Sequence, residues 1–336
     1  MLVDVFGQDA FQMEELTDAI NLLDHLPTRL GDMSLFTPQG VPTTSIAIEE
    51  LNGILSLVQT SERGGPGQRL AKGKRNLRTI QIPHISLEDT IKAEEIQGVR
   101  AFGSDANLQA VQATVAARQA ELRRSLELTQ ENLRLGAIKG VITDADASTL
   151  LNLATVFNVT PPSTQFLDLA SNTNLRGSIA AILRLVDAAL KGAGGLQFGY
   201  RAVCGATFWD NFVNHSDVKE TFLNWQAAQD LRGDGRRPLH FGGVDWEEYR
   251  GTDDGSTVSI DTDSFHLFPV GVPGLFREYY APADYMETVN TRGLPFYSKV
   301  AADGRFNKAA DLEVQTNYLA ICTQPGVLVT GSRNAS

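Results

Sequence analysis

Apolar residues recur at helical spacing over residues 105–135, and this pattern predicts one long helix. Ser104 is a suitable N-cap, and Gly136 is expected to end the helix. At about 1.5 Å per residue the helix would be roughly 45 Å long, more than a compact domain needs, so we expect it to serve as a spine. Its apolar face carries Leu108, Val111, Val115, Leu122, Leu126 and Leu133, and its solvent face carries Arg118, Glu121, Arg123, Arg124, Glu127 and Glu131.

The segment before the spine is predicted to be an N-terminal arm. Apolar positions over residues 9–25 fit a short helix that Pro27 closes, and residues 30–45, rich in Gly, Pro and Thr, look extended. This opening has too little apolar content to fold alone. We therefore expect it to lie on another surface, reaching a neighbouring copy.

Two segments of strand character follow, over residues 45–60 and 77–85. The Gly-rich connector between them has too few apolar residues to pack a core. Together they predict a long two-stranded hairpin with a flexible, basic tip.

The remainder of the chain predicts a mixed α/β body. Its expected elements are a strand and turn over 138–147, a helix over 178–191, a strand over 201–205, helices over 206–213 and 216–225, strands within 256–270, a short helix over 281–290 opened by Pro282, and closing strands over 318–322 and 327–329.

Composition and charge narrow the function classes. With 336 residues, 42% of them hydrophobic, the chain is long enough for one or two cores. Its net charge of -11 argues against a groove that grips DNA, which needs clustered Lys and Arg. Cys204 and Cys322 are too few for a disulfide framework and are predicted to be buried, reduced thiols. No signal peptide or membrane-spanning run is recognisable, so we expect a cytosol-like compartment.

Two local charge clusters suggest contact between copies of the chain. We hypothesise that a basic cluster within residues 62–78 lies on an acidic cluster within residues 244–263 of a neighbour. Two solvated loops that never meet remain the alternative. The basic residues are Arg63, Arg69, Lys72, Lys74, Arg75 and Arg78, and the acidic residues are Asp245, Glu247, Glu248, Asp253 and Asp254, with Asp261 and Asp263 nearby.

Motifs for catalysis, cofactors and metals are incomplete in this sequence. None of the five histidines forms a His-x-x-x-His pair or lies near a Cys pair. The stretch from Gly67 to Lys74 imitates a phosphate loop but has one residue too many between its glycines, and Arg75 replaces the Ser or Thr. The stretch 144–155 begins like a calcium loop, but Thr149 replaces its Gly and Thr155 its Glu. We predict no catalytic residues, no cofactor and no metal.

The order of arm, basic hairpin, single spine helix and α/β body resembles the lambda-type major head protein family (phage major capsid protein E), which has the Hong Kong 97-type capsid fold. The resemblance runs from Leu2 to about Gly331 and depends on the order of its segments. These are residues 44–53, 63–68, 83–91, 96–103, 136–140, 268–276 and 280–285.

This resemblance implies an α+β fold with an N-arm, an extended loop, a spine helix, and peripheral and axial domains. The arm would be residues 1–44 and the extended loop 45–95, with its basic tip at 62–78. Residues 96–178 would form the peripheral domain with the spine 105–135, 179–285 the axial domain, and 286–336 the last peripheral strands.

The implied function is that of a major capsid protein of a tailed bacteriophage. Hexamers and pentamers would build an icosahedral head around double-stranded DNA, without sequence-specific DNA binding and without a membrane. Expected partners are portal and scaffold proteins and, in some shells, a decoration protein. The protein would assemble in the host bacterial cytoplasm and end in the virion.

Some relatives join subunits by a Lys–Asn isopeptide bond. Lys72 and Lys74 lie in the right loop, but nothing identifies a partner Asn or the acid this chemistry needs, so we predict no covalent crosslink. Two other functions stay open from the sequence. The chain could be another phage head or tail structural protein, or a soluble α/β enzyme with an unrecognised site.

Overall fold

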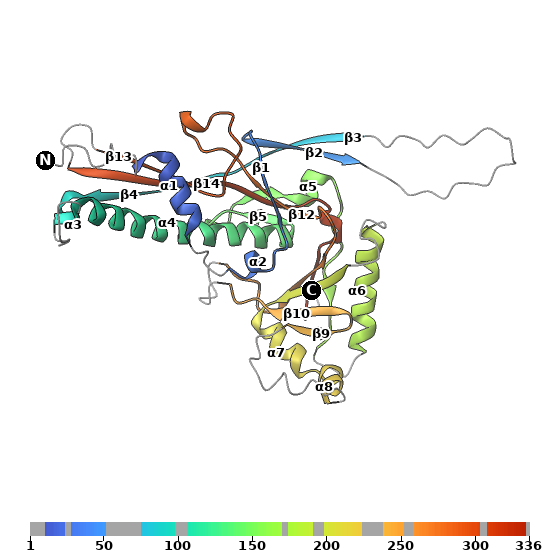
Figure 1. Ribbon diagram of the computed structural model, residues 1–336. Helices are drawn as coiled ribbons and strands as arrows, with labels where there is room; N and C mark the ends of the chain where they lie inside the picture. The colour runs from blue at the N-terminus through green and yellow to red at the C-terminus, as the bar shows by residue number, and fades with distance from the viewer. Residues whose placement is uncertain are drawn as a thin grey trace, which may run out of the picture.

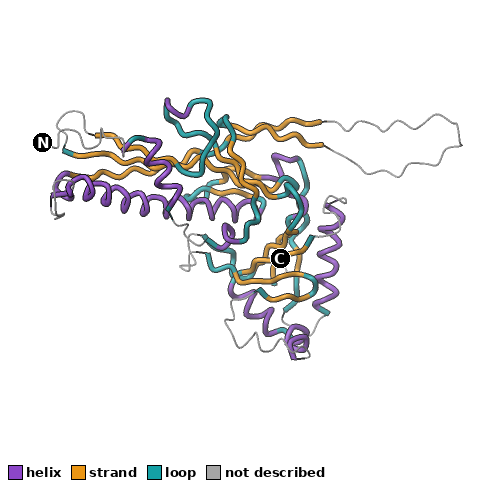
Figure 2. Tube along the Cα trace, viewed as in Figure 1, coloured by secondary structure: helices purple, strands orange, loops and turns teal. Residues whose placement is uncertain are grey.

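The computed structural model describes residues 11–23, 28–51, 75–97, 106–169, 174–190, 198–223, 238–251, 258–302 and 308–333. The strands form two main sheets with the longest helix along the first of them, and Figure 2 shows these two groups of strands. Within the described residues, no helix is both long enough and apolar enough to cross a membrane.

The spine is helix α4 (Ala106–Lys139), a single helix of 34 residues. It does not end at Gly136 as predicted. It continues to Lys139, and Gly140, at φ +82°, takes the left-handed conformation that ends a helix. A Cβ at Gly136 would lie 2.8 Å from the Cα of Ile142 on β5 (Val141–Thr143), so this glycine allows a strand to pack closely on the helix.

The first sheet has five strands and is built around β14 (Ala309–Cys322). Residues 309–317 of β14 pair antiparallel with β4 (His84–Lys92), and its other edge pairs antiparallel with β13 (Tyr297–Ala302). The second half pairs antiparallel with β12 (Phe276–Tyr280), beside which β1 (Thr37–Gly40) runs parallel. Helix α4 packs along β14, as Figure 1 shows.

The second sheet has the order β7-β15-β11-β8-β10-β9. Its core contains an aromatic cluster in which the rings of Phe212 and Trp246 lie 4.6 Å apart and Phe208 and Phe265 lie 5.0 Å apart. The strands are β7 (Gln165–Phe166), β8 (Gly199–Cys204), β9 (Leu239–Phe241), β10 (Val244–Glu248), β11 (Ser264–Val270) and β15 (Val329–Ser332), and the helices are α6 (Leu175–Leu190), α7 (Ala206–Asn214) and α8 (Ser216–Leu223).

Three strands pair across the predicted domain boundaries. β7 lies within the predicted peripheral segment 96–178 but pairs with β15 in the second sheet. β12 lies within the predicted axial segment 179–285 but pairs with β14 and β1 in the first sheet. β15 lies within the predicted peripheral segment 286–336 but pairs with β11 and β7 in the second sheet. The chain therefore passes from the second sheet to the first after β11 and returns to the second with β15.

The N-terminal segment packs on its own chain. Helix α1 (Met13–Leu22) buries Leu16 and Ile20 in a cluster with Val115 of α4 and Phe296. α2 (Arg29–Asp32) follows, and β1 joins the first sheet. The expectation that this arm reaches a neighbour because it has too little apolar content is therefore wrong for residues 11–23 and 28–40. A few well-spaced apolar side chains are enough to seat a short helix.

The predicted hairpin consists of β2 (Ser45–Leu51) and β3 (Arg75–Gln81), which pair antiparallel with Ile46 opposite Ile80. Both isoleucines are buried at the base, and the two strands form a sheet separate from the two main ones. The predicted second strand, 77–85, is in fact two strands, since the chain leaves β3 at Gln81 and enters β4 at His84.

The smaller elements match the predictions only in part. Helices α7 and α8 confirm the two predicted within 206–225, whereas the helix predicted over 281–290 is only the 3-10 turn η3 (Met286–Thr288), which Pro282 does not open. The remaining elements are α3 (Ala93–Gln97), β6 (Thr149–Asn152), α5 (Leu153–Phe157) and η4 (Pro325–Val327).

Candidate inter-subunit surfaces

The basic cluster of the hairpin lies mostly outside the described residues. Arg63, Arg69, Lys72 and Lys74 belong to that undescribed part, and Arg75 is the first residue of β3, at the outer end of the hairpin. Arg78 is partly buried, and its Nη1 donates a hydrogen bond to the backbone oxygen of Val156 at the end of α5. Arg78 therefore ties the hairpin to the body and is not part of a free basic cluster.

Glu247, one of the predicted acceptors, is an internal residue. Its side chain is 1% exposed, and its carboxylate accepts two hydrogen bonds from Arg29 of α2. The hydrogen bond to Glu247 raises the pKa of the Arg29 guanidinium. Glu247 is therefore no longer a candidate for contact with the basic cluster of a neighbouring copy, because its charge is already neutralised by Arg29 within the chain.

The other predicted acceptors differ in how freely their charge is displayed. Asp245 is 43% exposed, and its Oδ1 lies 2.8 Å from His240 Nδ1. Glu248 accepts hydrogen bonds from Arg250 at 2.7 and 2.9 Å. Asp253 and Asp254 lie outside the described residues. Asp245 therefore presents the most accessible carboxylate of this set in the described part of the chain.

The spine helix carries buried charges that the sequence pattern assigned to its solvent face. Arg123 is buried, donates to the backbone oxygens of Ile20 and Leu23, and pairs with Glu127 at 2.9 Å. It thus satisfies carbonyl groups at the C-terminal end of α1, where no helix partner exists. Their helical spacing gave no sign of this role, because α1 lies about a hundred positions away in the sequence.

A second buried network joins the N-terminal segment, the spine and both sheets. Oε1 of Glu131 accepts from the backbone nitrogen of Leu30 at 2.8 Å and from the hydroxyl of Tyr249 at 3.0 Å. Burial raises the pKa of the Tyr249 phenol, so it donates as a neutral hydroxyl. Nearby, Glu278 of β12 accepts from Arg134 at 3.1 Å and from Tyr318 at 2.8 Å. These contacts fix the spine relative to the strands around it.

An exposed apolar surface lies in the loop between β12 and β13. Met286 is 90% exposed, and Val289 and Leu294 are also exposed. The loop is nevertheless held by hydrogen bonds from Thr288 Oγ1 to Ala283 O and from Thr291 Oγ1 to Thr288 O, both 2.7 Å long. Exposed apolar side chains mark a contact surface where they form a contiguous patch, so this loop is a candidate for one. Sequence reasoning missed this surface because it assigned the segment to a helix.

Chemistry for metal binding or thiol reactions is not assembled in the described part of the chain. No group of three or more His, Cys, Asp or Glu residues there could hold a metal ion. Cys204 and Cys322 are free and fully buried, as predicted. Burial raises the pKa of the Cys322 thiol to about 12 and that of Cys204 well above its ordinary value, so both are inert at neutral pH.

The chain matches a known protein family over nearly its whole length. The family model described as phage major capsid protein E matches residues 12–333. The chain is 24% identical to the major capsid protein of Pseudomonas phage KPP10, covering 96% of this chain and 97% of the relative. It is 25% identical to that of Salmonella phage Felix O1, covering 95% of each.

Two solved structures share the fold at low sequence identity. A protein described as a prophage capsid protein from E. coli CFT073 has a TM-score of 0.59 at 15% identity, over 96% of this chain and 99% of the other. The capsid of an empty GTA particle has a TM-score of 0.52 at 11% identity, over 94% and 93%.

Proposed function

Because this chain belongs to the phage major capsid protein E family, with the Hong Kong 97-type fold, it is a major capsid protein of a tailed phage, and we propose how its copies assemble. In this proposal they form hexamers and pentamers of an icosahedral head around double-stranded DNA. The observation that carries it is the hairpin β2–β3, which buries Ile46 and Ile80 at its base but forms a two-stranded sheet apart from both main sheets. A contact between unlike surfaces closes into rings when its rotation closes.

Each of the two sheets is proposed to belong to a different domain of the subunit. We assign the first sheet with α4 to the peripheral domain and the second sheet, with α6, α7 and α8, to the axial domain at the centre of each ring. The separate strand orders of the two sheets support this assignment, while buried apolar residues from both sheets form one continuous cluster that joins the two parts.

The basic hairpin tip is proposed to lie on acidic surface of an adjacent copy. Asp245 is the described acceptor, with Glu248, Asp253 and Asp254 beside it in sequence. Opposite charges on neighbouring surfaces fix register and reject wrong partners more than they add affinity.

Charge reversal tests this contact. Changing Arg69, Lys72, Lys74 and Arg75 to Glu should leave the fold intact and abolish particles in negative-stain micrographs. Changing the exposed Lys92, Arg124, Arg184 and Lys219 to Glu makes the same change in net charge elsewhere and should leave particles. Asp245→Lys, Asp253→Lys and Asp254→Lys should restore particles to the reversed tip. Normal particles from the reversed tip alone would refute the contact.

The remaining roles follow from a container function. The net charge of -11 suits a shell that encloses DNA without binding its sequence. Assembly in the host cytoplasm with portal and scaffold proteins, and in some shells a decoration protein, belongs to this proposal. A shell subunit needs no catalytic site or cofactor, and we propose that the chain has neither.

The subunits are proposed to be held without covalent bonds. Particles boiled in detergent should then run as a single band near 36.5 kDa on a gel. A ladder of multiples of that mass would show a crosslink and contradict this prediction.

A further inference from the structure

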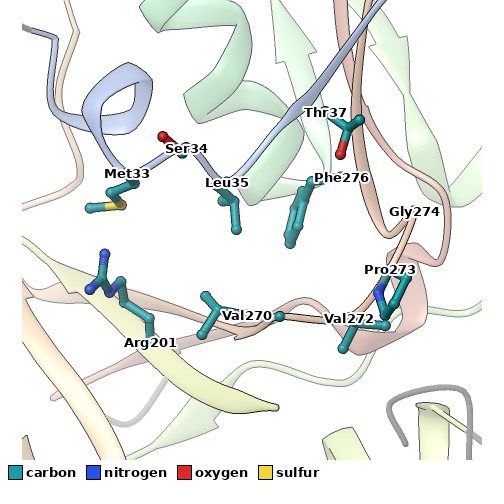
Figure 3. Close-up of a pocket in the computed structure, with 11 residues that line it drawn as sticks. Met33, Ser34, Leu35, Thr37, Arg201, Val270, Val272, Pro273, Gly274 and Phe276 are labelled. Carbon is teal, nitrogen blue, oxygen red and sulfur yellow. The ribbon is translucent and has the colours of Figure 1, made fainter. Parts of the chain in front are cut away.

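A hollow of about 400 Å³ lies where the two sheets meet, and nothing in the described part of the chain fills it. Its walls come from the loop before β1, from β8 and β11, and from the turn that leads into β12. Figure 3 shows Leu35 and Phe276 on one side, with Val270 and Arg201 on the other. The lining therefore mixes apolar side chains with polar groups, and it includes one cation.

Arg201 is the unusual member of this lining. It is partly buried on β8, and its Nε is buried without a hydrogen-bond partner among the described residues. Its neighbour in register on β10 is Asp245, whose Oδ1 is shared with His240, and no ion pair with Arg201 forms within the described residues. Because Nε is closed to solvent, an occupant of the hollow would meet the outer end of the guanidinium, and a cation at that position favours an anion.

We propose that this hollow receives an Asp or Glu side chain from a second copy of the chain. The carboxylate pairs with Arg201, and its aliphatic stem packs on Leu35, Val270 and Phe276. Charge complementarity favours a sister copy as the source, because the chain has 40 acidic and 29 basic residues and every copy presents carboxylates in excess. A planar guanidinium also suits bidentate binding of a carboxylate.

The consequence is a coupling between assembly and subunit shape. Because the hollow is lined from both sheets, a bound side chain contacts the peripheral and axial parts of its host at once. This inference rests on the assembly proposed above, so its first test uses the dispersed subunit, which needs no particle.

Hexanoate serves as a probe that combines a carboxylate with an apolar stem, and hexanol is its uncharged counterpart. Ligand-observed NMR on the dispersed subunit should detect hexanoate binding. Arg201→Gln should weaken it by about 10-fold or more, the range for a charge-assisted hydrogen bond, while Arg201→Lys keeps part of it. Arg184→Gln, the same change at an exposed site on α6, should leave binding unchanged. No hexanoate binding, or equal binding by Arg201→Gln, would overturn the site.

The source of the carboxylate is tested in particles. Met33 lines the hollow, so replacing methionine by photo-methionine places a photoreactive group there, and Met13→Leu with Met286→Leu removes the other internal ones. Particles built from light and nitrogen-15-labelled copies should give crosslinks from Met33 to an acidic peptide of a different copy. Crosslinks only within one copy, or only to another protein, would refute the sister-copy source.

The outcomes separate this inference from the assembly proposal. If hexanoate does not bind and Arg201→Gln still forms normal particles, the site is wrong and the hairpin contact is untouched. If hexanoate binds but the reversed hairpin tip forms normal particles, the hairpin contact is wrong and the site stands.

Discussion

Replacing Gly136 of the spine helix by Ala has two opposing effects on stability. It improves the helix propensity but adds a Cβ that crowds β5, and the measured stability shows which effect is larger. In a free helix, Gly→Ala stabilises by about 1 kcal/mol. Here the added Cβ would lie 2.8 Å from Ile142 Cα and 3.1 Å from Val141 O, both backbone atoms of β5. Overpacking of this kind typically costs about 1–3 kcal/mol, and backbone cannot rotate away as a side chain can.

We therefore expect Gly136→Ala to lower the free energy of unfolding by up to about 2 kcal/mol in spite of the better helix propensity. For a chain of this size, with a urea m-value of about 3 kcal/mol/M, the unfolding midpoint should fall by up to roughly 0.7 M. Circular dichroism of the dispersed subunit in urea gives this midpoint.

The matched control is Gly177→Ala in α6. The nearest atoms to a Cβ there all belong to the exposed side chain of Asn174, which accepts a hydrogen bond from the backbone nitrogen of Gly177 at 2.9 Å but can shift where the backbone of β5 cannot. This variant should keep its midpoint or raise it. If Gly136→Ala raised the midpoint as well, the close approach of β5 would not be a constraint, and the explanation of this glycine would be wrong.

Three further predictions concern buried polar groups. Burial lowers the pKa of His266 to about 3, below its usual 6.5, so the unfolded chain takes up a proton before the folded chain does as the pH falls. The free energy of unfolding should therefore fall by about 1.4 kcal/mol for each pH unit between roughly pH 6 and 3. The His266→Gln variant should lose this dependence when urea midpoints are measured across that pH range. Glu278→Gln should destabilise by about 3–5 kcal/mol in urea, because it leaves the buried Arg134 charge without this carboxylate; unchanged stability would contradict that pairing. Cys204 and Cys322 should not react with Ellman's reagent until the chain unfolds, and rapid reaction of the native subunit would contradict their burial.

Elements with local signals could be predicted from the sequence. The period of Leu and Val positions identified α4, the Gly-rich connector identified the hairpin, and α7 and α8 were found close to their ends. The family resemblance supplied the architecture. Neither alternative function fits relatives that are major capsid proteins over nearly their whole length.

Features that depend on distant partners could not be predicted in the same way. Arg123 and Glu127 have the spacing of a solvent face, yet they are buried because α1 covers them. Glu247 lies in a run of acids that reads as surface, but it is paired with Arg29 from more than two hundred positions earlier. A glycine after a run of helix-forming residues suggests a helix end, so Gly136 was expected to end the helix. Only the position of β5 shows that this glycine instead allows a strand to pack closely on the helix. Periodicity reports that a face is covered and not which segment covers it.

Strands β14 and β15 have a consequence for how the protein is made. β4 emerges from the ribosome long before its partner, residues 309–317, and the second sheet likewise waits for β15. Pairing over such long stretches of chain is slow and cannot begin before the later segment is synthesised. A polypeptide released before residue 309 would lack the strands that complete both sheets. Only products that contain β14 and β15 could then complete the subunit fold, so the order of synthesis itself excludes shortened chains from the head.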